Sequence, residues 1–186
     1  MEEALEILGA RLDELGHHIG VVVIGGASML LLGVIERPTA DVDVVGVASS
    51  HGYIAAEPLP RFLVDAVGEV GETLGLGAKW FNSGPSGLVT FGLPPGLEER
   101  VSIRIYGGLE VHLPAPEDLV CFKLYAAVDL TERSKHFTDL VALEPTRAQL
   151  LSAARWTRTH DPSAGFLGEL VRILNLLGAE VNDGDI

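Results

Sequence analysis

The sequence predicts an α/β (α+β) protein: a small mixed sheet with flanking helices, followed by a C-terminal helical bundle. Over roughly the first 115 residues, short runs rich in β-branched residues alternate with segments of helical periodicity. From Pro116 onward the periodicity is helical almost to the end. Pro114 and Pro116 interrupt regular structure between these patterns, so the 186-residue chain is expected to form two parts, residues 1–115 and 116–186.

The first three predicted elements are a helix, a strand and a helix. Apolar residues at helical spacing share one face of the first helix, and either Gly16 or Gly20 ends it. Residues 21–24, "VVVI", predict a short buried strand that stops at Gly25. Residues 27–35 then predict a second helix. The apolar face of the first helix consists of Leu5, Leu8, Leu12 and Leu15.

A second strand is predicted at 41–47, "DVDVVGV", because apolar and polar residues alternate in its first half. After a linker at 48–52, residues 61–76 predict a helix weakened by glycines. The rest of the first part is predicted as strands at 87–92, 100–106 and 109–113, with loops at 82–87 and 92–99. The second part is predicted as helices at 116–128, 134–143, 147–159 and 164–178.

Composition limits the classes of function. A net charge of −13 argues against broad binding to nucleic acid. Residues 121–160 carry six basic residues against four acidic ones, which permits a local basic site or simply a solvated helical surface. No apolar run reaches the roughly 18 to 20 residues of a membrane-spanning helix, and the N-terminus does not resemble a signal peptide. We therefore expect a soluble, cytoplasmic protein without membrane association.

Two aspartates open the second strand. Residues two apart on a strand project to the same face, so Asp41 and Asp43 point together while Val42 and Val44 face the core. The two like charges, about 6 to 7 Å apart, repel each other unless something compensates them. Mg²⁺ is typically held by one or two carboxylates and substrate phosphates, so the pair predicts a Mg²⁺ site. The alternative is the solvated end of an ordinary strand.

A glycine pair separates the first strand from the helix that follows. Gly25 and Gly26 let backbone amides and the positive helix end approach a phosphate closely, and Ser28 adds a hydroxyl in the same turn. The segment is neither a G-x-G-x-x-G dinucleotide motif nor a P-loop. A tight turn without function is the alternative. The order of strand, glycine turn, helix and acidic strand favours a nucleotide site.

Residues 23–45, "VIGGASMLLLGVIERPTADVDVV", resemble the signature of the DNA polymerase beta nucleotidyltransferase superfamily, a Gly-Gly or Gly-Ser turn followed by Asp-x-Asp. Arg37 and Thr39, just ahead of the aspartates, further resemble the minimal nucleotidyltransferases of the AbiEii type, known as toxins of bacterial toxin-antitoxin pairs. The resemblance implies a nucleotidyltransferase core in residues 1–115.

The resemblance continues in residues 114–143. There Lys123 on a helix, and a charged stretch with Arg133, Lys135 and Asp139, match the pattern of such proteins. The residues alone leave alternatives open. Lys123 lies in an apolar helix and would either reach the surface or meet a phosphate or a carboxylate. Asp139 would either belong to the site or make an ordinary surface ion pair with Lys135, four residues earlier.

The superfamily also has a third carboxylate on a later strand. Glu110 in "LEVHL" is the candidate here, because Glu98 and Glu99 fall in a predicted exposed loop. The resemblance thus implies transfer of a nucleoside monophosphate from an NTP to a hydroxyl, with release of pyrophosphate. The ligands implied for two Mg²⁺ ions are Asp41, Asp43 and Glu110.

The implied catalytic residues are Asp41, Asp43, Glu110, Lys123 and Asp139, and the implied nucleotide-binding residues are Gly25, Gly26, Ser28, Arg37 and Thr39. The AbiEii-type resemblance implies an RNA acceptor, such as the 3′ end of tRNA, and an antitoxin protein as partner. A small-molecule or protein hydroxyl is an alternative acceptor. Two other hypotheses are a nucleotide-binding or protein-interaction module that keeps the fold without catalysis, and a toxin that acts mainly through a protein partner.

Overall fold

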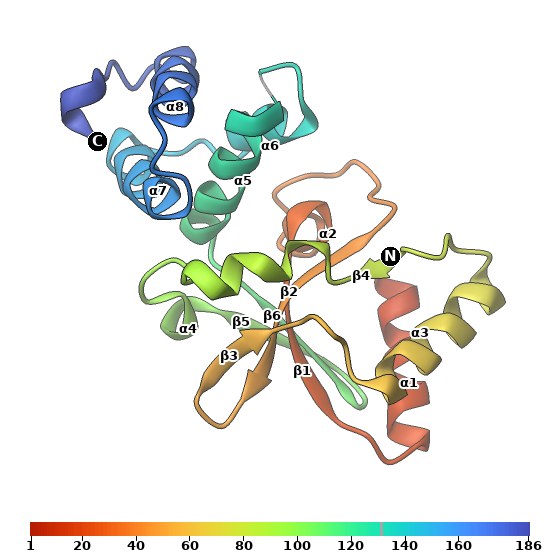
Figure 1. Cartoon of the computed structure of the whole chain (residues 1–186). Coiled ribbons are helices and arrows are strands. Elements are labelled where there is room, and N and C mark those ends of the chain that lie inside the picture. Colours follow the sequence, from red (N-terminus) through yellow and green to blue (C-terminus); the bar gives the residue numbers. More distant parts are fainter. Residues whose placement is uncertain (131) are drawn as a thin grey trace. The chain divides into compact units, whose positions relative to one another are not determined.

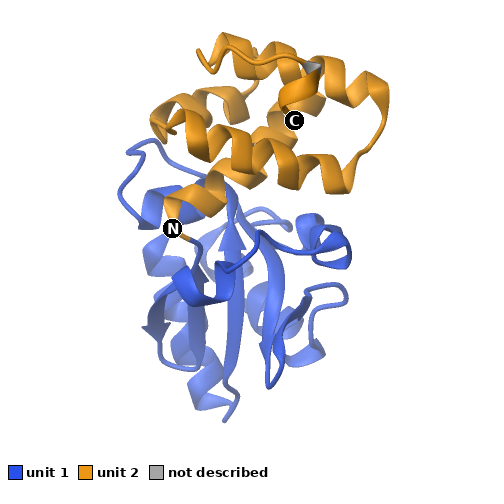
Figure 2. Cartoon of the chain, turned by 90° about the vertical axis from the view of Figure 1, so that its left-hand side faces the viewer, with its two compact units in different colours: residues 1–114 blue, residues 115–186 orange. Residues whose placement is uncertain are grey.

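The computed structural model describes residues 1–130 and 132–186. The chain forms two compact units, Met1–Pro114 and Ala115–Ile186, here called unit 1 and unit 2 (Figure 2). Unit 1 contains the sheet, and unit 2 is helical. None of the described helices has the length and apolar character that crossing a bilayer requires.

Six described strands form one mixed sheet in unit 1, which confirms the predicted fold class. They are β1 (Ile19–Ile24), β2 (Val42–Ser49), β3 (Gly52–Ala55), β4 (Phe81–Asn82), β5 (Ser102–Tyr106) and β6 (Leu109–Leu113) (Figure 1). The order is β3-β2-β1-β6-β5, and β4 also pairs with β2. The β1–β6 and β2–β4 pairs are parallel, and the other pairs are antiparallel.

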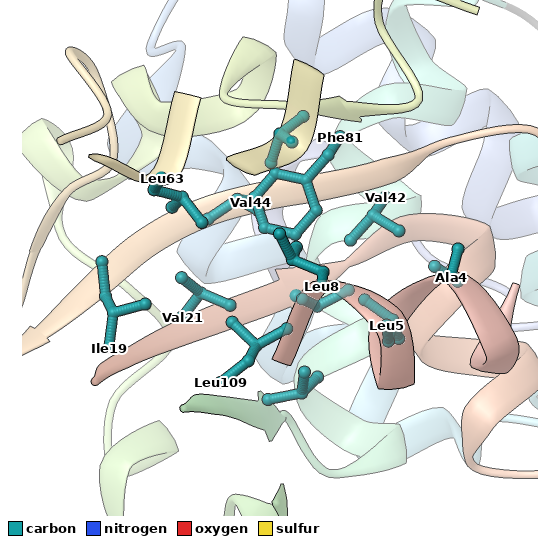
Figure 3. Packing of buried hydrophobic residues seen from close by; sticks show 14 of the residues in the cluster. Ala4, Leu5, Leu8, Ile19, Val21, Val42, Val44, Leu63, Phe81 and Leu109 are labelled. Atoms are coloured by element: carbon teal, nitrogen blue, oxygen red, sulfur yellow. The ribbon is translucent and has the colours of Figure 1, made fainter. Parts of the chain in front are cut away.

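Unit 1 also contains helices, several of which pack on its sheet. They are α1 (Glu2–Glu14), α2 (Gly25–Leu31), α3 (Arg61–Leu74), the 3-10 helix η1 (Gly84–Phe91) and α4 (Leu97–Arg100). Leu5 and Leu8 of α1 and Leu63 of α3 have no exposed surface and join one apolar cluster with β1 and β2 (Figure 3). Val42 and Val44 belong to this cluster, so the period-two alternation of β2 turns Asp43 toward the opposite face.

The face of the sheet opposite to α1 and α3 is partly covered by η1. A Cβ atom on Gly46 of β2 would lie 3.7 Å from Val89 of η1, which shows how closely η1 approaches this strand. Ile24 at the end of β1 pairs with Asp43, and directly paired residues point to the same face. The pairing of β1 and β2 shifts between Val22 and Val23. The Asp43 side chain, at the start of β2, therefore lies on the face of the sheet that η1 partly covers.

Several boundaries in the first half of unit 1 differ from the prediction. The first helix ends at Glu14, so Leu15 lies past its end and is 44% exposed instead of joining the buried face. Gly20 lies inside β1 and does not end a helix. The helix predicted at 27–35 begins at Gly25 and ends at Leu31. Gly33 follows with a φ of +74°, a conformation that glycine adopts easily and that breaks the helix.

The second half of unit 1 contains the larger errors. The strand predicted at 87–92 lies largely in the 3-10 helix η1, and β3 and β4 were not predicted. A short apolar run does not by itself distinguish a strand from a buried helix, and here flanking Gly and Pro residues allow the tight turns of η1. The predicted loop at 92–99 contains the start of α4, which carries Glu98 and Glu99.

Unit 2 confirms the four predicted helices as α5 (Pro116–Leu130), α6 (Lys135–Ala142), α7 (Arg147–His160) and α8 (Ala164–Leu176), followed by the 3-10 helix η2 (Asp183–Asp185). Side chains cap the N-termini of α6, α7 and α8. Ser134 accepts from Phe137 N–H, Ser163 accepts from Phe166 N–H, and Thr146 forms a capping box with Gln149. Helix α5 contacts α6, α7 and α8 and is the centre of the unit.

Candidate functional site

The end of β1 and the start of β2 bring the glycine turn against Asp43. Gly25 follows Ile24 directly and has a φ of +77°. A Cβ atom on Gly25 would lie 2.5 Å from Asp43 Oδ2, closer than non-bonded atoms can approach. Only glycine therefore fits at position 25 unless the structure shifts. Its left-handed backbone conformation disfavours other residues, and the Asp43 carboxylate occupies the space that a side chain would need.

The loop before β2 packs against the second glycine of the turn. A Cβ atom on Gly26 would lie 2.9 Å from Thr39 Oγ1 and 3.9 Å from Arg37 Nη2. Thr39 Oγ1 donates to Asp41 Oδ1 at 3.3 Å, and Asp41 is half-buried. The structure thus brings six of the predicted site residues together on unit 1: Gly25, Gly26, Arg37, Thr39, Asp41 and Asp43.

A residue that the sequence did not indicate completes this cluster. Asn82, the last residue of β4, pairs with Asp43 in the parallel register of β2 and β4. Its Nδ2 donates to Asp43 Oδ1 at 3.1 Å. In the sequence, Asn82 begins the turn-like segment "NSGPSG", which indicates a bend of the backbone and gives no sign of a side-chain partner 39 residues earlier.

Ser28 does not line an open part of this cluster. It has no exposed surface, and within the described residues its Oγ has no hydrogen-bond partner. A phosphate would reach this hydroxyl only if the turn moved. Helix α2 has seven residues, so its dipole adds little, and phosphate binding would depend mainly on the backbone amides of the glycine turn. The assignment of Ser28 to nucleotide binding stays a prediction.

The structure does not bring Glu110 to the two aspartates. Glu110 pairs with Gly20, four residues along β1 from the partner of Asp43, which corresponds to about 13 Å. Its carboxylate lies 3.5 Å from His112 Nε2, and His112 Nδ1 lies 2.8 Å from the Tyr53 hydroxyl. Burial, and then the charge of Glu98, raise the pKa of the Tyr53 phenol. Glu110 thus belongs to a separate polar group.

Lys123 and Asp139 form a buried ion pair within unit 2. Lys123 Nζ donates to Asp139 Oδ2 at 2.5 Å, and the two residues are 3% and 1% exposed. Lys123 therefore does not extend to the surface. Asp139 lies in the interior, so the alternative of an ordinary surface pair with Lys135 is wrong. Roles of Lys123 and Asp139 in catalysis stay predictions.

The two carboxylates of the cluster fit Mg²⁺ only together with a bound molecule, such as a triphosphate, that supplies further oxygen atoms. Among residues 1–130 and 132–186, no group of three or more His, Cys, Asp or Glu side chains is arranged to hold a metal ion. Asp41 and Asp43 supply two carboxylates, which matches the way Mg²⁺ is bound by one or two carboxylates and substrate phosphates. The predicted three-carboxylate set with Glu110 is not assembled.

A mixed sheet whose first strand ends in a glycine turn beside two aspartates defines a nucleotidyltransferase-type core. The chain matches the family described as nucleotidyltransferase of unknown function (DUF6036) over residues 2–136, and it belongs to that family. It matches no curated protein and no solved structure. The family supports the superfamily-level prediction from the motifs and does not single out the AbiEii toxin type.

Proposed function

We propose that this protein transfers a nucleoside monophosphate from an NTP to a hydroxyl acceptor, using Mg²⁺ held by Asp41 and Asp43. The observation that supports this most directly is the close approach of Asp43 to the backbone of Gly25, where an added Cβ atom would lie only 2.5 Å from the carboxylate. The backbone of the turn and an acidic side chain thus lie side by side. Amide donors suit phosphate oxygens, and a carboxylate suits the cation that accompanies them.

The residues of the chain have distinct roles in this proposal. The amides of Gly25 and Gly26 donate to the triphosphate, and the Arg37 guanidinium beside Gly26 compensates its charge. Thr39 orients the Asp41 carboxylate through its 3.3 Å hydrogen bond. The acceptor oxygen forms a bond to the α-phosphorus, the bond from that phosphorus to the bridging oxygen breaks, pyrophosphate leaves, and the hydroxyl proton passes to solvent. When bound, Mg²⁺ lowers the pKa of the acceptor hydroxyl and neutralises charge on the leaving group.

The finer proposal is that the acceptor is an RNA, such as the 3′ end of tRNA, and that the protein is the toxin of a toxin-antitoxin pair. It is supported by the resemblance of residues 23–45 and 114–143 to AbiEii-type proteins. The excess of basic over acidic residues in 121–160 is compatible with an RNA ligand.

Incubation with labelled NTPs, Mg²⁺ and total RNA tests the reaction. We expect label from one or more NTPs on RNA of tRNA size, and no transfer when EDTA removes the metal. Binding of NTP without transfer to RNA, small molecules or protein would favour the non-catalytic binding module. Absence of both binding and transfer would contradict the proposed function.

Replacing Gly25 by Ala tests whether the turn is part of the binding site. We expect a loss of about 1 to 2 kcal/mol in stability from the left-handed backbone, together with loss of the Mg²⁺·NTP-dependent rise in melting temperature, because the new Cβ displaces Asp43. Gly33→Ala is the matched control, since Gly33 has a φ of +74° and a Cβ there would meet nothing within 4 Å. If both variants keep the ligand-dependent rise, the turn does not hold the nucleotide.

A further inference from the structure

The Asp43 carboxylate lies between the glycine turn and the side chain of Asn82. Oδ1 accepts from Asn82 Nδ2 at 3.1 Å, and Oδ2 lies where a Cβ on Gly25 would be 2.5 Å away. Rotation of the carboxylate away from this position would lengthen the hydrogen bond from Asn82. The glycine turn limits the space on one side, and Asn82 provides a directional contact on the other.

The amide of Asn82 is itself held in one orientation. Its Oδ1 accepts from Gly84 N–H at 3.0 Å, and its Nδ2 lies 3.4 Å from the Val42 carbonyl oxygen as well as near Asp43. An amide turned by 180° would place its oxygen against a carboxylate and a carbonyl, and its NH₂ against an N–H. The hydrogen bonds therefore fix which end of the amide faces Asp43.

The short strand β4 explains how this contact arises. Phe81 is 4% exposed and joins the core cluster of unit 1, and it pairs with Val42. The next residue, Asn82, then lies beside Asp43 and points to the other face of the sheet. Burial of Phe81 thus determines the position of Asn82 along β2.

We propose that Asn82 is a positioning residue that keeps the Asp43 carboxylate oriented for Mg²⁺·NTP, an inference that rests on the proposed function. The group next to Asp43 on the neighbouring strand is a neutral amide that donates, so it orients the carboxylate without adding a third negative charge. Asn82 acts through Asp43 and is not itself required to touch the nucleotide.

Two substitutions separate this role from a purely structural one in the turn. Asn82→Ala removes both the donor to Asp43 and the acceptor for Gly84 N–H. Asn82→Ser keeps a short acceptor that suits the turn but lacks an amide that reaches Asp43. Asn175→Ala is the matched control, because the Asn175 side chain makes two comparable backbone hydrogen bonds to Val181 in unit 2.

The primary readout is the Mg²⁺ concentration that gives half of the NTP-dependent rise in melting temperature. We expect this concentration to increase about ten- to hundredfold in Asn82→Ala and Asn82→Ser, as is typical when a group that orients a metal ligand is removed. Asn175→Ala should require the wild-type Mg²⁺ concentration. At low Mg²⁺ transfer should slow in both Asn82 variants, and high Mg²⁺ should restore most of it.

Two outcomes would contradict the inference, and they are distinguishable. If the wild type shows the ligand-dependent rise and Asn82→Ser needs no more Mg²⁺, Asn82 serves only the turn, and the proposed function is unaffected. If the wild type shows no rise with any NTP, both the inference and the proposed function fail.

Discussion

Replacing Asp43 by Asn is expected to abolish nucleotidyl transfer while leaving the metal-free protein at least as stable as the wild type. A bound metal contributes several kcal/mol of charge stabilisation in the transition state, and a loss of about 4 kcal/mol lowers the rate roughly a thousandfold. In the metal-free protein the same substitution relieves the repulsion between Asp41 and Asp43. The amide oxygen introduced at position 43 can still accept the hydrogen bond from Asn82 that the carboxylate accepts at 3.1 Å.

Adding Mg²⁺ and NTP should make the wild type more stable than Asp43→Asn. An NTP with Mg²⁺ at one hundred times its dissociation constant stabilises the native state by about 2.7 kcal/mol, and only the wild type binds both components fully. Thermal melts with Mg²⁺ alone, each NTP alone and each combination measure this, beside the rate of label transfer.

Asp65→Asn is the control for Asp43→Asn. Asp65 on α3 makes a surface ion pair with Arg61 at 2.9 Å, and its side chain is 52% exposed. Its loss should change stability by no more than about 0.5 kcal/mol and leave the ligand-dependent rise intact. If no combination of ligands raises the melting temperature of the wild type above that of Asp43→Asn, the proposal of a Mg²⁺·NTP site at Asp43 is contradicted. The results would then favour a binding module that works without metal.

Replacing Lys123 by Met should produce the largest loss of stability. It leaves the Asp139 carboxylate, which is 1% exposed, without the ammonium that lies 2.5 Å away. Removing one partner of a buried ion pair typically costs about 3 to 5 kcal/mol, whereas replacing both partners by apolar residues is often close to neutral. Lys123→Met with Asp139→Leu should therefore recover most of the stability that the single substitution loses.

Denaturant unfolding of the two variants measures this difference. Arg172→Met is the control in unit 2, because Arg172 pairs with Glu132 and with Glu169 at 2.8 Å through side chains that are all more than a third exposed, and each such pair should contribute at most about 1 kcal/mol. NTP affinity of the double variant then tests the predicted role of Lys123. A stable double variant that no longer binds NTP supports that role. Wild-type affinity in the double variant would make the pair purely structural.

The sequence contained enough information for the part of the site that is built by neighbouring residues. The turn at Gly25 and the acids at Asp41 and Asp43 come from adjacent elements, and period-two alternation alone places Asp43 on the face opposite to Val42 and Val44. The fold class followed from the same alternation and from the helical periodicity of the second part.

Contacts that depend on strand register could not be predicted. The superfamily resemblance suggested Glu110 as the third acid, but the parallel pairing of β6 places it opposite Gly20 instead of near Asp43. Nothing in either strand's own sequence specifies that offset. Asn82 was missed because β4 has only two residues, too few to show any periodicity. Similarly, the ion pair of Lys123 and Asp139 depends on how α5 and α6 pack.

The parallel pairing of β1 with β6 also affects the order in which the chain can fold during synthesis. Ile19 pairs with Leu109, 90 residues later, whereas the other neighbour of β1 is the nearby β2. A ribosome that adds about 5 to 20 residues per second needs roughly 5 to 18 s to make that length of chain. Throughout this interval one edge of β1 has no native neighbour, and its unpaired backbone groups are open to strands of other nascent chains.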